Sequence, residues 1–391
     1  MGGLKIRYTT ISWIFLCFLC MPLAYFQEVT HAGFIVNRIC QLSLIYAVYL
    51  LVSQNVRLEK HINWLVIFAI WHFIAGLLNS NTLDSSFSLM YKSLVVIVLT
   101  KHILQNNIER GLSSLVTLMG GALILNTITK ILPFSVMIDG REVYFIGSRI
   151  SLSDVFLYAC SIAFIYTVLY KRRYAFTILT VISGAYFVII ESVSTAIMTI
   201  TVFVLVFLYL RIANRILANR RKQTVFVTIV IIACLYFVFY SRNGTNLGWL
   251  LEGFLKEDLT FNGRTILWEK ALEKIEGVHW IIGYGLSHGQ WFELPNGFAA
   301  TTAHSQYINI VFRSGVIGLT FYILAIYKML RDSFNVHIVS YRYILVSSIC
   351  AFWVTGISTT TYESFFMYVW MTTIYQLNRN YLCQEDIIVN A

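Results

Sequence analysis

The sequence consists largely of apolar runs of about 20 residues that recur along its whole length. A transmembrane α-helix needs roughly 17–25 apolar residues to cross the hydrocarbon core of a bilayer, and most of these runs reach that length. Only 12% of the 391 residues are charged, whereas a soluble domain carries about 25%. The mean hydropathy of +0.70 agrees with this. We therefore predict an all-α, polytopic membrane protein.

The runs predict about 12 transmembrane helices within a single integral membrane domain, residues 1–391. Two of them, 174–190 and 195–210, are short and closely joined, so they either span separately or dip into the membrane and return; we favour two spans. The predicted spans are residues 8–24, 33–52, 62–79, 87–104, 111–132, 151–170, 174–190, 195–210, 223–240, 305–327, 341–360 and 364–378.

Charge in the connecting loops predicts the orientation. With the N-terminus in the cytoplasm, the inner loops and tail hold 18 of the 29 Lys and Arg but only five of the 19 Asp and Glu. Lys and Arg concentrate on the cytoplasmic side of membrane proteins, so both termini are expected there. The net charge of +10 therefore indicates orientation, and we expect no nucleic-acid partner.

The N-terminus and the cysteines indicate neither a cleaved signal peptide nor a disulfide. Lys5 and Arg7 precede an apolar run, as in a signal peptide, but no small-residue cleavage site follows, so we expect an uncleaved first helix. Six of the seven cysteines lie in predicted spans and one in the inner tail. No disulfide is therefore expected in an outer loop.

Two outer segments stand out from the apolar runs. Residues 133–149 carry Arg141 and Arg149, and residues 241–303 form the one long loop; loops of that length are usually functional or disordered. Within it, residues 264–276 (RTILWEKALEKIE) place apolar side chains at helical spacing, with charged residues between them. We predict a helix that lies on the membrane surface or covers the bundle, closed by Gly277.

The clearest motif is His304-Ser305, nine residues, Gly315, two residues, Gly318. On a helix His304 and both glycines would share one face, where glycines let another helix approach closely. The motif resembles that of the bacterial O-antigen polymerases and ligases. Arg264, Trp268, a Gly-Tyr-Gly turn at residues 283–285 and then the His-led span also stand in the order of those families.

The resemblance implies a glycosyltransferase that acts at the outer side of the bacterial cytoplasmic membrane. Members transfer glycans from undecaprenyl pyrophosphate to a sugar hydroxyl, and they are similar to other multispan enzymes that use lipid-linked donors. It implies an undecaprenyl-pyrophosphate-linked oligosaccharide and membrane lipid as partners, together with a chain-length regulator protein. We favour a polymerase of O-antigen or capsule repeat units over a ligase, because Ser305 stands where ligases commonly have Asn. A flippase or transporter is the third alternative; those are commonly built from internal repeats, and none is visible.

Candidate roles follow from the chemistry of such a transfer. A sugar hydroxyl needs a base, and histidine titrates near neutral pH, so His304 is the predicted catalytic residue. Guanidinium groups grip pyrophosphate with paired donors, which makes arginines the candidate clamps. The outer segments show no convincing carboxylate cluster, so we expect metal-independent chemistry without a cofactor. The candidate substrate-binding residues are Arg264, Arg149, Arg141, Arg313 and Tyr284.

Each candidate also has a structural interpretation. His304 could simply cap its span, and Arg264 could anchor the surface helix. Arg149 could extend to the membrane boundary, as long basic side chains do. Arg313 lies nine residues inside its span, where a charge is usually paired or functional; a structural ion pair and a contact with the lipid pyrophosphate are equally good explanations.

Overall fold

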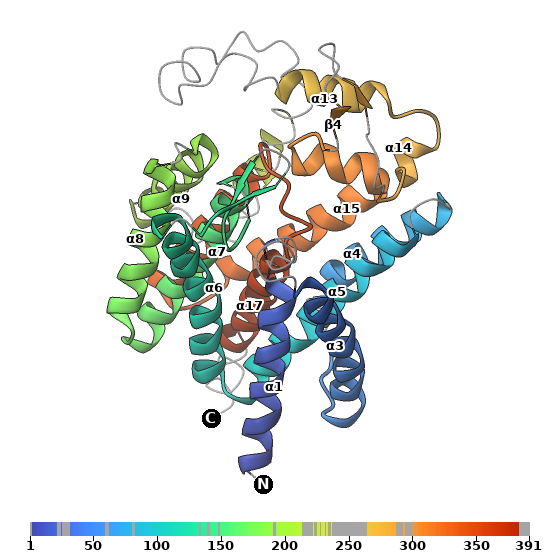
Figure 1. The fold of residues 1–391 in the computed structure, drawn as a ribbon. Helices are drawn as coiled ribbons and strands as arrows, with labels where there is room; N and C mark the ends of the chain where they lie inside the picture. The colour runs from blue at the N-terminus through green and yellow to red at the C-terminus, as the bar shows by residue number, and fades with distance from the viewer. Residues whose placement is uncertain are drawn as a thin grey trace.

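Long α-helices account for most of the chain in the computed structural model (Figure 1). An α-helix satisfies its own backbone N–H and C=O groups, which is the condition for crossing lipid. The structure describes residues 2–21, 25, 32–58, 62–79, 83–132, 134–138, 141–147, 149–190, 193–212, 222, 225–226, 228–230, 232–233, 236, 264–286, 292–293, 299–300 and 302–382.

The helices coincide with the apolar segments of the sequence, except that predicted span 223–240 and loop residues 241–263 lie largely outside the described residues. The helices are α1 (Gly2–Cys20), α3 (Gly33–Ser53), α4 (Asn63–Leu78), α5 (Leu83–Asn106), α6 (Ile108–Ile131), α7 (Arg149–Tyr170), α8 (Tyr174–Ile190), α9 (Ser194–Ile212), α13 (Arg264–Glu273), α14 (His279–Ile282), α15 (Gln306–Phe334), α16 (Val339–Thr355) and α17 (Phe365–Leu382). Two short hairpins accompany them: β1 (Val136–Ile138) with β2 (Arg141–Val143), and β3 (Phe292–Glu293) with β4 (Ala299–Ala300).

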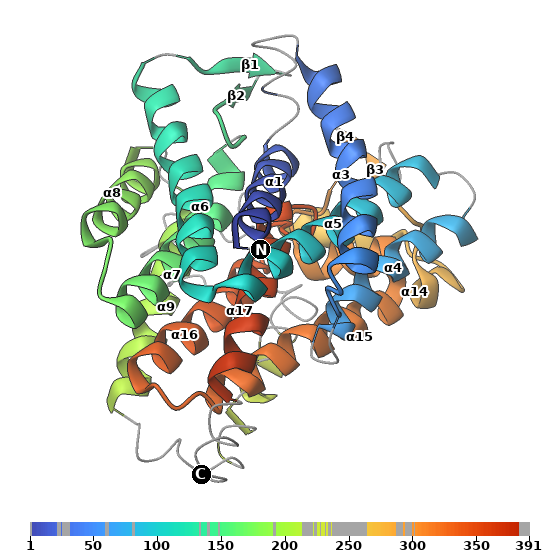
Figure 2. The same cartoon turned by 90° about the horizontal axis from the view of Figure 1, so that it is seen from below.

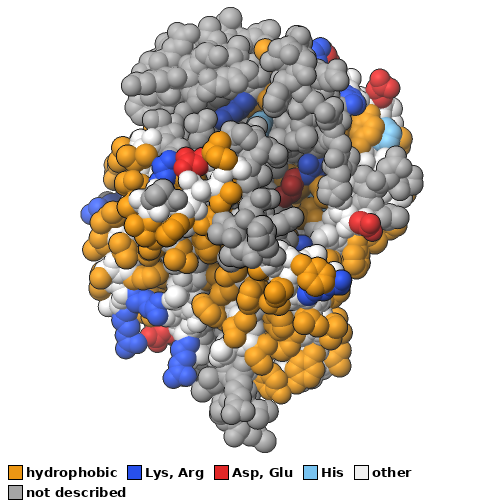
Figure 3. All heavy atoms as spheres, in the orientation of Figure 1, with side chains coloured by type: hydrophobic (Ala, Val, Ile, Leu, Met, Phe, Trp, Pro, Cys, Tyr) orange, Lys and Arg blue, Asp and Glu red, His pale blue; other side chains and the backbone are white. Residues whose placement is uncertain are grey.

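Within the described part of the chain, five helices are long and apolar enough to cross a membrane: α3, α5, α6, α9 and α15. Shorter apolar helices lie in α1, α4, α7, α8 and α16. Hydrophobic side chains cover much of the outer surface in the view of Figure 3. The prediction of an all-α polytopic membrane protein is confirmed.

The helices surround a core formed by α17, which packs against α5, α7 and α15. Figures 1 and 2 show α8 and α3 on opposite flanks of this core. The two short segments of the sequence analysis form separate helices with different neighbours. α8 packs on α6 and α7, whereas α9 packs chiefly on α16.

Two side-chain contacts join helix ends, and both can be compared with the sides of the membrane predicted from charge. Asn106 donates to Thr9, linking the end of α5 to α1. Arg172 forms an ion pair with Glu109 at 2.6 Å, linking the α7–α8 connection to the start of α6. Each pair joins segments that the charge pattern assigns to one side of the membrane. α13 lies at the opposite end of the molecule from the start of α1 (Figure 1).

The β1–β2 hairpin is held by a polar cluster around Glu142. Its carboxylate accepts hydrogen bonds from Ser135 (2.6 Å) and Tyr144 (2.7 Å) and pairs with Lys130 at 3.0 Å. The hydrogen bond from Ser135, then those from Tyr144 and Lys130, lower the pKa of Glu142 to about 2. This cluster stabilises the segment that leads into α7.

Candidate functional site

The turn that carries His304 is fixed on both sides by named contacts. The Ala303 N–H donates to Asn309 Oδ1 at 2.8 Å, and the Ala303 carbonyl accepts from Trp268 Nε1 at 3.0 Å. The His304 N–H donates to Thr302 Oγ1 at 3.2 Å. His304 itself has φ of 50°, a left-handed conformation that is uncommon outside glycine and costs about 1–2 kcal/mol. The surrounding contacts therefore hold the backbone of His304 in a conformation that a non-glycine residue seldom adopts. Its side chain is half-buried.

The prediction that His304, Gly315 and Gly318 share one helix face is wrong. α15 begins at Gln306, after the His304 turn, and it is broken at Gly315, where φ is 64° and ψ is −173°. The pattern was interpreted on a continuous helix, and the helix is not continuous. The motif instead spans a turn, a short helical segment and a break.

The break exists because two glycines allow two backbones to touch. Gly283 has φ of 74°, and a Cβ there would lie 2.3 Å from the carbonyl carbon of Arg313. A Cβ on Gly315 would lie 2.0 Å from the carbonyl oxygen of Ile281. The N–H groups of Tyr284 and Gly285 then donate to the carbonyls of Phe312 and Arg313, at 2.8 and 2.9 Å. The Gly-Tyr-Gly turn and the broken helix thus fit together through backbone contacts that a side chain at either glycine would prevent.

Helix α4 supports this junction from the other side. Trp71 Nε1 donates to the carbonyl of Ser314 at 2.8 Å, next to the break. Asn79 Nδ2 donates to the carbonyl of Gly283 at 3.0 Å. The carbonyl of Ser314, at the break in α15, therefore finds a partner on α4, and Asn79 at the end of α4 holds the Gly-Tyr-Gly turn beside it.

Helix α13 covers the His304 turn, as the amphipathic pattern predicts. Its Trp268 and Ala271 are buried, while Glu269 and Glu273 face outward. Gly277 has φ of 52° and follows the helix. Arg264 is the first residue of α13 and precedes Trp268 by one turn, on the same face. Because Trp268 contacts Ala303, this places the half-buried Arg264 on the side of α13 that faces the His304 turn.

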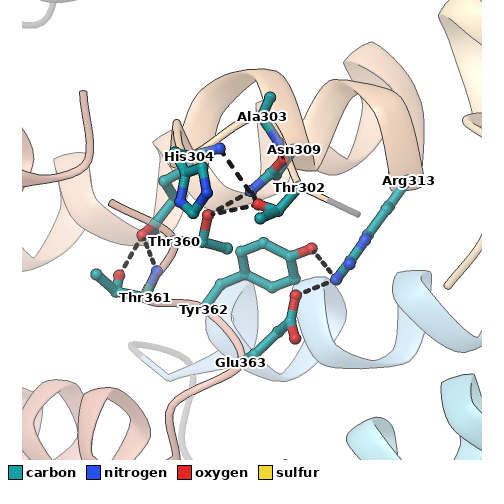
Figure 4. Close-up of polar contacts among 10 residues, drawn as sticks. Thr302, Ala303, His304, Asn309, Arg313, Thr360, Thr361, Tyr362 and Glu363 are labelled. Carbon is teal, nitrogen blue, oxygen red and sulfur yellow. Dashed lines mark hydrogen bonds and ion pairs between the residues drawn. The ribbon is translucent and has the colours of Figure 1, made fainter. Parts of the chain in front are cut away.

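A second connection ties the first half of α15 to residues 356–363 (Figure 4). Asn309 Nδ2 donates to Thr302 Oγ1 at 2.8 Å and to Thr360 Oγ1. Gln306 accepts from the Thr361 N–H at 2.8 Å, and the Gln306 N–H donates to the carbonyl of Gly356 at 2.8 Å. The segment between α16 and α17 therefore belongs to the site, although the sequence analysis did not include it.

Arg313 lies at the other end of the first half of α15 and has two partners in this segment. Its Nη1 donates to the Tyr362 hydroxyl at 2.7 Å and forms an ion pair with Glu363. This is the structural pair that was one of the two explanations of Arg313. Glu363 was missed, and the signal was available: it is the acidic residue in the short connection between the last two predicted spans.

Tyr284 has its polar group fully engaged. The hydroxyl donates to the carbonyl of Lys274 at 2.8 Å and accepts from the N–H of Glu276 at 3.2 Å. Its ring stacks on His279, with centroids 4.0 Å apart, and packs on Phe312 at 5.0 Å. These contacts join the end of α13 to α15 and give Tyr284 a positioning task.

Arg141 and Arg149, both in residues 133–149, lie at element boundaries. Arg149 is the first residue of α7, and Arg141 begins β2 opposite Ile138. The orientation of both side chains lies outside what the structure describes. Their predicted contact with substrate therefore stays a prediction.

Two further features concern ligands. In the described part of the chain, no group of three His, Cys, Asp or Glu side chains is placed to hold a metal ion. An apolar cavity of about 290 Å³ lies between α1 and α6 and reaches Phe366, three residues after Glu363. Its lining includes Trp13, Cys17, Leu118, Leu125 and Ile146.

The comparisons agree with this arrangement. Residues 178–323 match the family described as O-antigen ligase. This stretch is similar to that family, and it covers less than half of the chain. No curated protein and no solved structure matches the chain.

The matched stretch includes Arg264, the Gly-Tyr-Gly turn, His304 and α15 as far as residue 323, past its break at Gly315. Arg141, Arg149 and Glu363 lie outside it. The similarity thus covers the His304 turn and its glycine junction, whereas the segment between α16 and α17 joins the site through contacts of Asn309, Gln306 and Arg313.

Proposed function

We propose that this protein is a polymerase that joins undecaprenyl-pyrophosphate-linked oligosaccharide repeat units into O-antigen or capsular polysaccharide. The reaction takes place at the outer side of the bacterial inner membrane, with both termini in the cytoplasm. The main support is the His304 turn: a histidine held in a left-handed conformation beside the Arg264 helix, within the match to the O-antigen ligase family.

In the proposed mechanism His304 acts as the general base. The anomeric carbon of the donor sugar is attacked by a hydroxyl of the acceptor, and His304 takes the hydroxyl proton as the new bond forms. A positioned base contributes about 10²–10⁴-fold to such a step. The bond from the sugar to the pyrophosphate breaks, and undecaprenyl pyrophosphate leaves. Thr302 and Asn309 hold the backbone of the turn that carries the imidazole.

Arginines stabilise the leaving pyrophosphate in this proposal. Arg264 is the first candidate, because it begins α13 and this helix contacts the His304 turn through Trp268; Arg149, Arg141 and Arg313 are the further candidates. A guanidinium keeps its charge and offers two parallel donors to phosphate oxygens. Tyr284 acts indirectly, because it holds the end of α13 against Phe312. The apolar cavity that ends at Phe366 suits the hydrocarbon part of a lipid-linked donor.

A ligase that transfers a finished glycan to a lipid or other acceptor is the second candidate. Its support is the description of the matched family as O-antigen ligase. Ser305, in place of the Asn common in ligases, favours the polymerase. A chain-length regulator is the expected partner of a polymerase, whereas a ligase needs none.

Surface glycan from a deletion strain separates the two functions. On a gel, loss of the ladder with one repeat unit retained indicates the polymerase. Loss of all attached glycan, with accumulation of lipid-linked polymer, indicates the ligase. An unchanged glycan profile would contradict both.

Metal independence has its own test, with purified protein and a synthetic lipid-linked repeat unit. Activity that persists in excess EDTA supports arginine-based stabilisation of the pyrophosphate. Complete inhibition that is reversed by magnesium or manganese would assign this task to a metal ion.

A further inference from the structure

The contact between Arg313 and residues Tyr362 and Glu363 has the form of an anion-binding site that is already occupied. The guanidinium and the phenol hydroxyl lie together at 2.7 Å, and the carboxylate of Glu363 pairs with the same Arg313 nitrogen (Figure 4). A carboxylate and a phosphate present the same kind of oxygen acceptor to a guanidinium. We propose that Arg313 and Tyr362 form a binding site for the diphosphate of a lipid-linked ligand, and that Glu363 occupies this site until the ligand displaces it.

The two sides of the contact are held very differently. The Arg313 side chain is only 8% exposed and Tyr362 is fully buried, whereas the Glu363 side chain is 44% exposed. Here the cationic side is fixed and the anionic side reaches the surface, as expected for an anion that exchanges.

The fixed side is positioned by backbone and aromatic contacts. The carbonyl of Arg313 accepts from the Gly285 N–H at 2.9 Å, next to the glycine junction. The Tyr362 ring packs against His72 and Phe68 of α4, with centroids 5.1 and 6.3 Å apart. The backbone of Arg313 and the ring of Tyr362 are therefore held by contacts that do not involve Glu363.

The position of Arg313 and Glu363 in the molecule supports a lipid-linked diphosphate as the ligand, rather than a free anion. Phe366, which lines the apolar cavity, follows Glu363 by three residues. On the other side, His304 lies in the turn just before α15, and the helix rises about 10 Å from Gln306 to Arg313 at 1.5 Å per residue. A ligand with its hydrocarbon chain in the cavity and its diphosphate at Arg313 would direct its sugar towards His304. This inference rests on the proposed function for the identity of the ligand.

Binding of farnesyl diphosphate to the purified full-length chain tests the site without requiring glycan transfer. Glu363→Gln keeps the shape of the side chain and removes the competing charge, so its Kd should fall about tenfold. Arg313→Gln should weaken binding by at least tenfold. Glu273→Gln is the matched control, because Glu273 is also paired with a basic side chain, Lys270, at the surface, and its Kd should equal that of the wild type.

Chemical labelling of the wild type gives a second measurement. A water-soluble carbodiimide with an amine nucleophile labels free carboxylates, and the peptide containing Glu363 is quantified by mass spectrometry. Farnesyl diphosphate should increase labelling of Glu363 severalfold and leave Glu273 unchanged. Inorganic diphosphate with the same effect at equal concentration would indicate a site for free diphosphate, and would overturn the lipid-linked assignment.

Two results would overturn the occupied site itself. One is a Glu363→Gln protein with wild-type melting temperature and unchanged or weaker binding. The other is carbodiimide labelling of Glu363 that does not increase when farnesyl diphosphate is added. Because it uses the wild type, this measurement remains valid if Glu363→Gln fails to fold. Failure of the polymerase proposal looks different: the binding changes would remain, while the glycan ladder of a deletion strain would be normal.

Discussion

Helices α3 and α15 are nearly equal in mean hydropathy, 1.7 and 1.8, yet they occupy opposite environments. The apolar window of α3 is 28% buried, whereas that of α15 is 61% buried. α3 shows Phe34, Ile45 and Val52 to the outside, while α15 buries Gln306, Asn309 and Arg313. Average hydropathy therefore indicates that a helix is in a membrane, and buried polar side chains indicate which helix forms the site. A buried polar group is costly unless it is hydrogen-bonded. The buried polar side chains of α15 therefore need polar partners on the neighbouring segments.

The sharpest test of this comparison is His304→Asn. Asparagine tolerates the left-handed conformation of residue 304, so the fold should be retained, but it provides no base at neutral pH. Glycan polymerisation should fall by about 10²–10⁴-fold, measured as the rate of polymer formation from a lipid-linked repeat unit. Ile45→Ala on the outside of α3 is the control and should keep wild-type activity. Full activity of His304→Asn would remove the proposed base.

Gly315→Ala should have the largest effect on stability. The added Cβ would lie 2.0 Å from the carbonyl oxygen of Ile281 and would require φ of 64°, so α14 and α15 must separate. We expect a loss of about 3 kcal/mol in the free energy of unfolding, detected as a lower melting temperature in detergent.

Gly121→Ala provides the matched control for that substitution. Gly121 is also in a long helix, but a Cβ there would have nothing within 4 Å. Its stability should stay the same or rise by up to about 1 kcal/mol, the difference in helix propensity. Equal melting temperatures for the two alanine variants would show that the glycine junction contributes nothing.

Asn309→Ala measures how much the polar contacts of α15 contribute. It removes the acceptor of the Ala303 N–H and the donor to Thr302 and Thr360. Leaving these buried groups unpaired should cost about 2 kcal/mol. Ser43→Ala on α3 is the counterpart, since the Ser43 hydroxyl donates only to Cys40 of its own helix, and it should change stability by less than about 0.5 kcal/mol. A similar melting temperature for both variants would contradict the distinction drawn between the two helices.

The smallest effect on stability is expected for the titration of Glu142 in the β1–β2 hairpin. The folded-state pKa of Glu142 is lowered to about 2 from 4.5. Its stabilising contribution is therefore fully present above pH 4.5 and is lost as the pH falls towards 2. In Glu142→Gln this pH dependence should disappear, measured as hydrogen exchange of the β1–β2 amides between pH 6 and 2.5. An identical acid response in wild type and variant would rule out Glu142 as its source.

Particular residues show how far sequence reasoning reaches into the site. Trp268 and Ala271 were placed on the buried face of a helix, because apolar spacing is a local property, and the structure agrees. Gly315 was recognised as important, but it was placed on a continuous helix, since no local signal shows that Gly283 lies against the same backbone. Glu363 could have been noticed as the acidic residue between the last two predicted spans, but its pairing with Arg313, 50 residues away, could not be read from the sequence.

The sequence by itself determined the membrane class and the position of nearly every helix, because the length and apolarity of a segment are enough to make it a helix in lipid. It also singled out His304 and Arg264 as candidates, and their roles stay predictions. The tertiary structure decided where α15 breaks, what holds the His304 turn and which carboxylate lies beside Arg313. These depend on close approach between segments far apart in the chain, such as Ile281 with Gly315 and Asn309 with Thr360. Local composition carries no record of such contacts, since they arise only when the helices pack together.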